Sequence, residues 1–310
     1  MPTVENVTFK NKTLDVAADV YFPDGFDASR TFPAIVSAHP IGSCKEQTSG
    51  NVYGKALAEQ GYVVLAFDAT HQGASGGEPR HIEDPGLRVE DFRCAVDYLV
   101  TLDYVDEDRI GLLGICGGGG YAVTAAMTDR RFKALGTVSA VNYGRMMREG
   151  DLSPDAAIKT LDAVAQQRTA EARGAEPRVD DVLPSSPEKA EELGITALDV
   201  VEATKYYRTS RGQQPHGVNL SLFSHSGPAI GYDAFHLAEQ LLTQPLQIVI
   251  GGVPGEFGSY RDGFDLFDRA RSSQKDIVVV PGQSHYDMYW KPEATRQALD
   301  TLIPFYNKNL

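Results

Sequence analysis

The chain has 310 residues, a length of roughly two domains, although α/β folds of this size are often single. Hydrophobic residues make up 42% and charged residues 23% of the chain, a balance typical of a globular protein with a sizeable core. The formal net charge of −13 argues against nucleic acid or an anionic membrane as the main partner, because both repel an acidic surface.

Cysteine usage indicates a reducing environment. The three cysteines, Cys44, Cys94 and Cys116, show no C-x-x-C spacing, so we expect neither a disulfide framework nor a zinc site. We therefore expect a cytoplasmic protein that uses no metal or cofactor. Segment 1–23 alternates like strands and predicts no signal peptide, and no apolar run approaches the roughly 18 residues of a membrane span.

The first half of the chain alternates between apolar strands and segments with helical spacing. Two antiparallel strands joined at Asn11-Lys12 come first, "VENVTFK" and "LDVAADVYF". Buried strands are then predicted at "PAIVSAHP", "YVVLAFDA", "RIGLLGI" and "FKALGTVSAV". The helical segments between them are "GNVYGKALAEQG", "RVEDFRCAVDYLVTL" and residues 117–127. Strands separated by helices predict a mostly parallel sheet that is covered on both faces.

This pattern stops at about Tyr143, and no convincing strand follows until after Gly212. Charged, helix-prone segments fill the interval, so we predict a helical cap over residues 143–215, inserted into a single domain that spans residues 1–310. The sheet pattern resumes at "PLQIVIGG" and "DIVVVPG", and a closing helix is predicted at "EATRQALDTLIPFYNK".

A glycine-rich turn joins one buried strand to the helix that follows it. Gly114-Ile-Cys116-Gly-Gly118 has the form G-x-C-x-G, the nucleophile-elbow pattern with cysteine in the serine position. The turn is so sharp that side chains two residues on either side of Cys116 would collide, which explains Gly114 and Gly118. The backbone N–H of Gly117 lies at a helix N-terminus, where it can donate to a developing oxyanion.

Two other interpretations of Cys116 compete with a catalytic nucleophile. A lone cysteine is most often a small buried hydrophobic residue. A strand, glycines and a helix also describe a dinucleotide-binding loop, but the G-x-G-x-x-G pattern is not matched here. The candidate base and acid that follow later in the sequence favour a nucleophile over these two alternatives.

The base and the acid are expected after the last two strands of the sheet. His285 follows "DIVVVPG", where a hydrolase base would lie, and it either takes the thiol proton or rests with the cysteine as a thiolate–imidazolium pair. Glu256 is our first candidate for the acid that orients His285. Asp262 and Asp265 compete with it, and Asp287 is less favoured because it is close to His285 in the sequence.

The second oxyanion donor is expected in the loop after "PAIVSA". Pro40 has no N–H, so the N–H of Ile41 is the candidate. His39 is a candidate substrate contact, although a structural role in holding this loop competes with that reading. Tyr143, Met147 and Tyr207 of the cap are further candidates for substrate contacts, as are Met146 and Tyr206, and packing within the cap is the competing role for each.

The chain resembles α/β-hydrolases of the dienelactone-hydrolase-like group, and more closely the subset described as YcjY-like hydrolases. The stretches that carry the resemblance are "HPIGSCKEQT", "FDATHQGASGGEPR", "EDPGLRVEDFRCAVDYL", "VDEDRIGLLGICGGGGYA", "DRRFKALGTVSAV" and "PGQSHYDMY". The resemblance implies the α/β-hydrolase fold, a triad of Cys116, His285 and an acid, and acyl-transfer chemistry on a small ester, lactone or thioester. Similar fungal proteins serve as thiohydrolases or acyltransferases in polyketide pathways.

Three other functions compete with a hydrolase. An acyltransferase would use the same triad with a second nucleophile in place of water. A peptidase of the prolyl-oligopeptidase type would cleave amides, but the chain lacks the long propeller domain of such enzymes. A non-catalytic ligand receptor on a hydrolase scaffold would show no turnover. A homodimer through the cap or an edge strand is compatible with the sequence.

Overall fold

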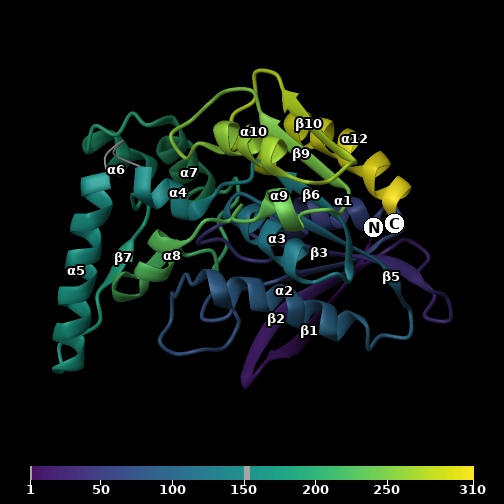
Figure 1. Ribbon diagram of the computed structural model, residues 1–310, viewed down its shortest axis with the longest axis horizontal. Coiled ribbons are helices and arrows are strands. Elements are labelled where there is room, and N and C mark those ends of the chain that lie inside the picture. The colour runs from purple at the N-terminus through teal and green to yellow at the C-terminus, as the bar shows by residue number, and fades with distance from the viewer. Residues whose placement is uncertain (1, 150–153) are drawn as a thin grey trace.

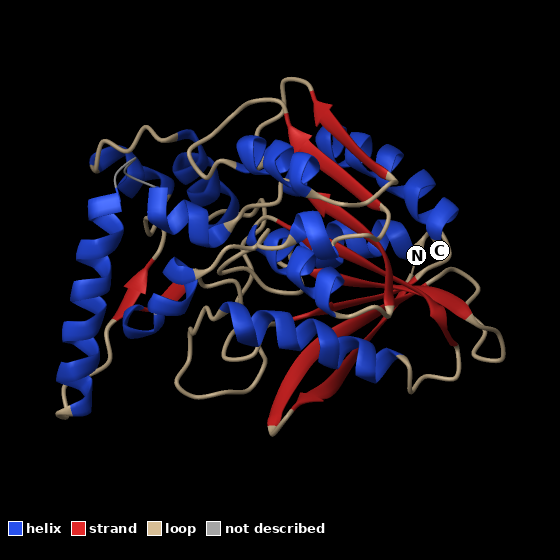
Figure 2. Ribbon diagram, in the orientation of Figure 1, coloured by secondary structure: helices blue, strands red, loops and turns tan. Residues whose placement is uncertain are grey.

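The computed structural model describes residues 2–149 and 154–310 (Figure 1). Eight strands form one twisted sheet in the order β1-β2-β4-β3-β5-β6-β9-β10 (Figure 2). β1 pairs antiparallel with β2 and β2 with β4, whereas all later pairings are parallel. The strands are β1 (Thr3–Asn11), β2 (Leu14–Phe22), β3 (Phe32–Ala38), β4 (Val63–Phe67), β5 (Val105–Ile115), β6 (Phe132–Val138), β9 (Leu246–Gly251) and β10 (Lys275–Val280).

Helices cover both faces of this sheet, which confirms the predicted fold class. The first face carries α2 (Pro85–Leu99), α3 (Gly117–Thr128), α9 (Ala238–Leu241) and α10 (Ser259–Arg269). The second carries α1 (Lys55–Ala58), α11 (Asp287–Trp290) and α12 (Pro292–Asn309). Successive strand residues point to opposite faces, so Leu112 of β5 lies in the first apolar core and Leu113 in the second.

The segment predicted as a cap lies to one side of the sheet, and the short helix α8 (Gly227–Gly231) lies on the same side (Figure 1). Its helices are α4 (Tyr143–Glu149), α5 (Pro154–Ala172), α6 (Pro187–Glu192) and α7 (Leu198–Tyr207). A short strand β7 (Val179–Asp181) was not expected; it pairs with β8 (Leu220–Leu222), and a 3₁₀ turn η2 (Phe223–His225) and α8 (Gly227–Gly231) follow. Three residues are too few to show strand alternation in the sequence.

Two other features concern the expected helices. In place of one helix over residues 50–61, a π-helical turn η1 (Thr48–Gly54) precedes the short α1. The Ser49 carbonyl within this turn accepts a hydrogen bond from the Ser37 hydroxyl of β3, a tertiary contact that helical spacing does not reveal.

Within the described residues, no helix is both long and apolar enough to cross a membrane.

The junction between β5 and α3 brings backbone segments into close approach. Cys116 has φ 55° and ψ −128°, a conformation that side-chain-bearing residues rarely adopt. A Cβ on Gly114 would lie 2.5 Å from Gly119 Cα, and one on Gly118 would lie 2.5 Å from the His39 carbonyl oxygen. Both positions therefore require glycine, as the G-x-C-x-G pattern of the sequence predicted.

We expect Gly114→Ala to lower the free energy of unfolding by about 1–3 kcal/mol, because the added methyl overpacks a backbone contact. Gly231→Ala is the control, since a Cβ there meets open space, and its effect should stay within about 0.5 kcal/mol. Urea denaturation of both variants measures the difference, and equal stability of the two would contradict the steric argument.

Candidate active site

Cys116 lies at the sharp turn after β5, and its backbone is fixed on both sides. Its N–H donates to Val138 at 3.1 Å, and its carbonyl accepts from Gly119 and Val141, each at 2.9 Å. The side chain is 7% exposed. The backbone N–H groups of Gly117 and Ile41 both donate hydrogen bonds to its sulfur. The two groups predicted as oxyanion donors therefore converge on the thiol.

His285 lies in the loop between β10 and α11 and is buried. Its Nδ1 is 2.9 Å from the Ser259 hydroxyl, and its Nε2 is 2.9 Å from the Tyr289 hydroxyl. Tyr289 in turn forms a side-chain hydrogen bond with the Cys116 thiol. The structure thus links Cys116 to His285, but through a phenol that the sequence analysis did not single out.

Burial controls the charge of both groups. It raises the pKa of the Cys116 thiol to about 11, although the hydrogen bonds that the sulfur shares with Tyr289 and Gly117 oppose the shift. Burial also lowers the pKa of His285 to about 3. Both side chains are therefore neutral at pH 7, which disfavours a resting thiolate–imidazolium pair.

Glu256 does not orient His285 in this structure. Its carboxylate is exposed and accepts hydrogen bonds from the backbone N–H groups of Leu198 and Asp199, both at 3.0 Å. These groups begin helix α7, where a carboxylate is favourable. The loop after β9 therefore presents Glu256 to the cap, and the Ser259 hydroxyl occupies the place beside His285 Nδ1.

The other candidate carboxylates also have partners elsewhere. Asp262 is buried and forms an ion pair with Arg145 at 2.6 Å. Asp265 lies 3.6 Å from Arg269. Asp287 accepts a hydrogen bond from the backbone N–H of Ser284 at 3.2 Å and pairs with Lys291.

Sequence reasoning missed Tyr289, Ser259 and Asp199. Tyr289 follows His285 by four residues, a helical spacing that could have suggested a shared face. Asp199 is 1% exposed; one of its oxygens accepts from Phe257 N–H at 2.6 Å, and the other has no hydrogen-bond partner among the described residues. Burial, with the charge of Glu256, raises the pKa of Asp199 to about 6. Its negative charge also raises the pKa of Cys116.

His39 holds the loop that carries Ile41, and its side chain is fully buried. The Arg88 guanidinium donates to the His39 carbonyl at 2.8 Å and lies 2.9 Å from its Nε2, while Nδ1 is 2.7 Å from the Pro40 carbonyl. These contacts fit the competing role of His39 in holding the loop, and a substrate contact at His39 stays a prediction.

A cavity of about 390 Å³ opens above the Cys116 sulfur. Three cap residues predicted as substrate contacts, Tyr143, Met147 and Tyr207, line it. Met146 also lines it, whereas Tyr206 is not among the lining residues and packs instead against the rings of Tyr207 and Tyr289. The volume lies within the range of pockets that bind small molecules.

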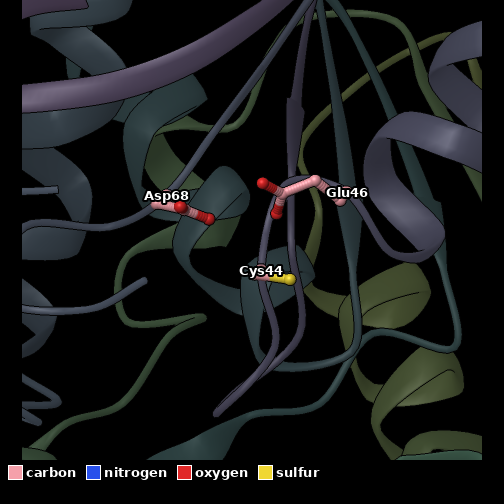
Figure 3. Close-up of side chains that lie close together, drawn as sticks. All are labelled: Cys44, Glu46 and Asp68. Carbon is pink, nitrogen blue, oxygen red and sulfur yellow. The ribbon is translucent and has the colours of Figure 1, made fainter. Parts of the chain in front are cut away.

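A second cluster combines a thiol and two carboxylates. Figure 3 shows Cys44, Glu46 and Asp68, whose ligand atoms all lie within 4.8 Å of one another. Both Asp68 oxygens accept backbone hydrogen bonds, from Lys45 and Ala74, and the Lys45 ammonium lies 2.6 Å from Glu46. Glu46 is thus paired with a lysine and Asp68 is bound by backbone N–H groups, so we assign no metal to this cluster.

The doubly covered sheet, with its antiparallel first strands, is that of an α/β hydrolase. The model of the X-Pro dipeptidyl-peptidase (S15) family matches residues 13–211. The chain is 42% identical to YcjY of Escherichia coli (strain K12) over 303 residues, which is 97% of this chain and 96% of that protein. The chain belongs to the S15 family, which is of the α/β-hydrolase type, and an enzyme of the hydrolase type is supported.

Two further proteins are similar to this chain. The crystal structure of PA2218 from Pseudomonas aeruginosa superposes with a TM-score of 0.90 at 30% identity, covering 100% of this chain and 94% of that one. The thiohydrolase aneE of Aspergillus aculeatus is 31% identical over 206 residues, 62% of this chain and 61% of that protein.

Removing the Glu256 carboxylate should weaken the start of α7 and leave catalysis nearly intact. We expect Glu256→Ala to lower the free energy of unfolding by about 1 kcal/mol, as for a lost helix cap. Glu59→Ala, at an exposed position, is the control and should stay within about 0.5 kcal/mol. Denaturation curves and turnover of both variants test this, and a loss of kcat of about 100-fold would restore Glu256 as the acid.

The raised pKa of Cys116 predicts slow alkylation at neutral pH. Only the thiolate reacts with iodoacetamide, and below a pKa of about 11 its fraction rises about tenfold per pH unit. The alkylation rate of Cys116 should therefore climb steadily from pH 7 to pH 9. Timed mass spectrometry of the peptide that carries Cys116 measures this rate, and a plateau below pH 8 would indicate a resting thiolate instead.

Proposed function

We propose that this chain hydrolyses a small carboxylic ester, lactone or thioester through a covalent acyl-enzyme on Cys116. The observation that carries the proposal is the convergence of the Ile41 and Gly117 N–H groups on the sulfur of Cys116, a residue that lines the cavity of about 390 Å³. Two backbone donors beside a nucleophile are the arrangement that stabilises the oxyanion of a tetrahedral intermediate.

In the first half of the reaction, His285 takes the proton that leaves Cys116. The sulfur attacks the acyl carbonyl, whose oxygen becomes an oxyanion facing the N–H groups of Ile41 and Gly117. When the intermediate collapses, the bond to the leaving group breaks and His285 returns the proton to that group. Because both side chains start neutral, proton removal accompanies attack rather than preceding it.

Water completes the cycle. It attacks the thioester carbonyl and gives a proton to His285, and this proton then returns to the Cys116 sulfur as the carboxylic acid leaves. No cofactor takes part in any of these steps. The neutral His285 is able to act as the base in both halves.

The cavity lining favours an apolar acyl group of moderate size. Met146, Met147 and Val182 come from the cap segment, and Phe223 and Phe257 complete the apolar wall. A volume of about 390 Å³ suits an acyl chain better than a peptide or a polymer. Similarity to a protein named a thiohydrolase supports a thioester among the candidate substrates.

Two alternative functions, an acyltransferase and a peptidase, can be tested with one set of substrates. An acyltransferase would pass the acyl group from Cys116 to a second nucleophile, so its product would appear only when an acceptor is added. The S15 family model is named for an X-Pro dipeptidyl-peptidase, and a peptidase would cleave an X-Pro amide. Assays with an acyl thioester, a p-nitrophenyl ester, a lactone and an X-Pro anilide, each run with and without an added acceptor, separate the three functions.

Cys116→Ala should abolish turnover of esters and thioesters, because it removes the sulfur on which we propose the acyl-enzyme forms. In the unaltered protein, mass spectrometry after rapid quenching should find the acyl mass on the peptide that contains Cys116. Cys94→Ala is the control, since this cysteine lies in the core between α2 and the sheet and its loss should leave the adduct in place. Turnover that persists in Cys116→Ala would refute the proposal.

A further inference from the structure

A hydroxyl lies between the two groups that must exchange a proton. The Tyr289 oxygen is 2.9 Å from His285 Nε2 and also shares a hydrogen bond with the Cys116 thiol. Tyr289 is fully buried. Its backbone is held in α11 by a hydrogen bond to Tyr286, and the ring of Tyr206 packs edge-on against its ring. The phenol is thus fixed at this position.

The donors and acceptors of these groups allow one continuous series of hydrogen bonds. A neutral imidazole has one N–H and one acceptor nitrogen. When Nδ1–H donates to the Ser259 hydroxyl, Nε2 accepts the proton of the Tyr289 hydroxyl. The phenol oxygen keeps acceptor capacity for the thiol proton of Cys116. Each donor in this series of hydrogen bonds then faces an acceptor.

We propose that Tyr289 is a catalytic residue that relays the proton from Cys116 to His285, a role that rests on the function proposed above. As the sulfur attacks, the S–H bond breaks and its proton forms a bond to the phenol oxygen. In the same step the phenol's own O–H bond breaks and its proton forms a bond to Nε2. The tyrosine is neutral before and after, and the net change is a new sulfur–carbon bond, an oxyanion on the attacked carbonyl and an imidazolium.

The same relay runs in reverse when thioester hydrolysis ends. The imidazolium returns a proton to the phenol oxygen, and the phenol gives its proton to the departing sulfur. Burial raises the pKa of Tyr289 well above its usual value, which keeps the phenol protonated through the cycle. A competing role is a lock that holds the thiol away from His285, in which case removal of the hydroxyl would speed acylation.

The test measures acylation directly, as the burst of p-nitrophenolate from p-nitrophenyl hexanoate. In Tyr289→Phe the burst rate should fall about 100-fold, the scale of a lost acid–base step. Tyr53→Phe is the matched control. It removes another fully buried phenol hydroxyl, which donates to the Met288 carbonyl at 2.7 Å, and its burst rate should stay within about threefold of the original.

A second measurement uses the unaltered protein, so it does not depend on how Tyr289→Phe folds. In mixtures of H₂O and D₂O, a relay moves two protons in one step, so the acylation rate should curve with deuterium fraction. A straight line, or a fall of less than about tenfold in Tyr289→Phe, would overturn the relay. A burst that survives in Cys116→Ala would instead refute the acyl-enzyme itself, so the two failures are distinguishable.

Discussion

The close approach of backbone at the β5–α3 junction is the constraint on which the site depends. Cys116 occupies a backbone conformation of a kind that costs about 1–3 kcal/mol, and hydrogen bonds from Gly119 and Val141 to its carbonyl hold it there. Because Gly118 carries no side chain, the loop after β3 can pass directly over the turn. That passage brings the Ile41 N–H to the sulfur.

Enclosure is the second determinant of the chemistry. The cap segment contributes Tyr143, Tyr207 and Asp199 to the surroundings of Cys116, and each is buried. In this setting a charge is costly, so the thiol and the imidazole both stay neutral. In the reaction that we propose, the thiol proton must leave as the sulfur bonds to carbon, and the buried Tyr289 hydroxyl offers the proposed route.

The sequence predicted the sheet, the sharp turn at Cys116 and the position of His285 because each depends on local pattern. Strand periodicity and the glycine spacing around Cys116 can be read within short windows. The partner of His285 could not be read in this way, since it depends on how the loop after β9 packs against the cap. Glu256 is directed to α7 by that packing, and only the structure reveals Ser259 and Tyr289 beside the imidazole.

The protonated state of Cys116 has a consequence for survival under oxidative stress. Peroxides oxidise thiolates, and susceptible cysteines are usually exposed and of low pKa. Cys116 is 7% exposed, and its pKa is raised to about 11. A buried, protonated thiol of this kind is shielded from conversion to sulfenic acid. In the proposed mechanism the sulfur loses its proton to the Tyr289–His285 relay only as it bonds to the acyl carbon, and the acyl group then covers it.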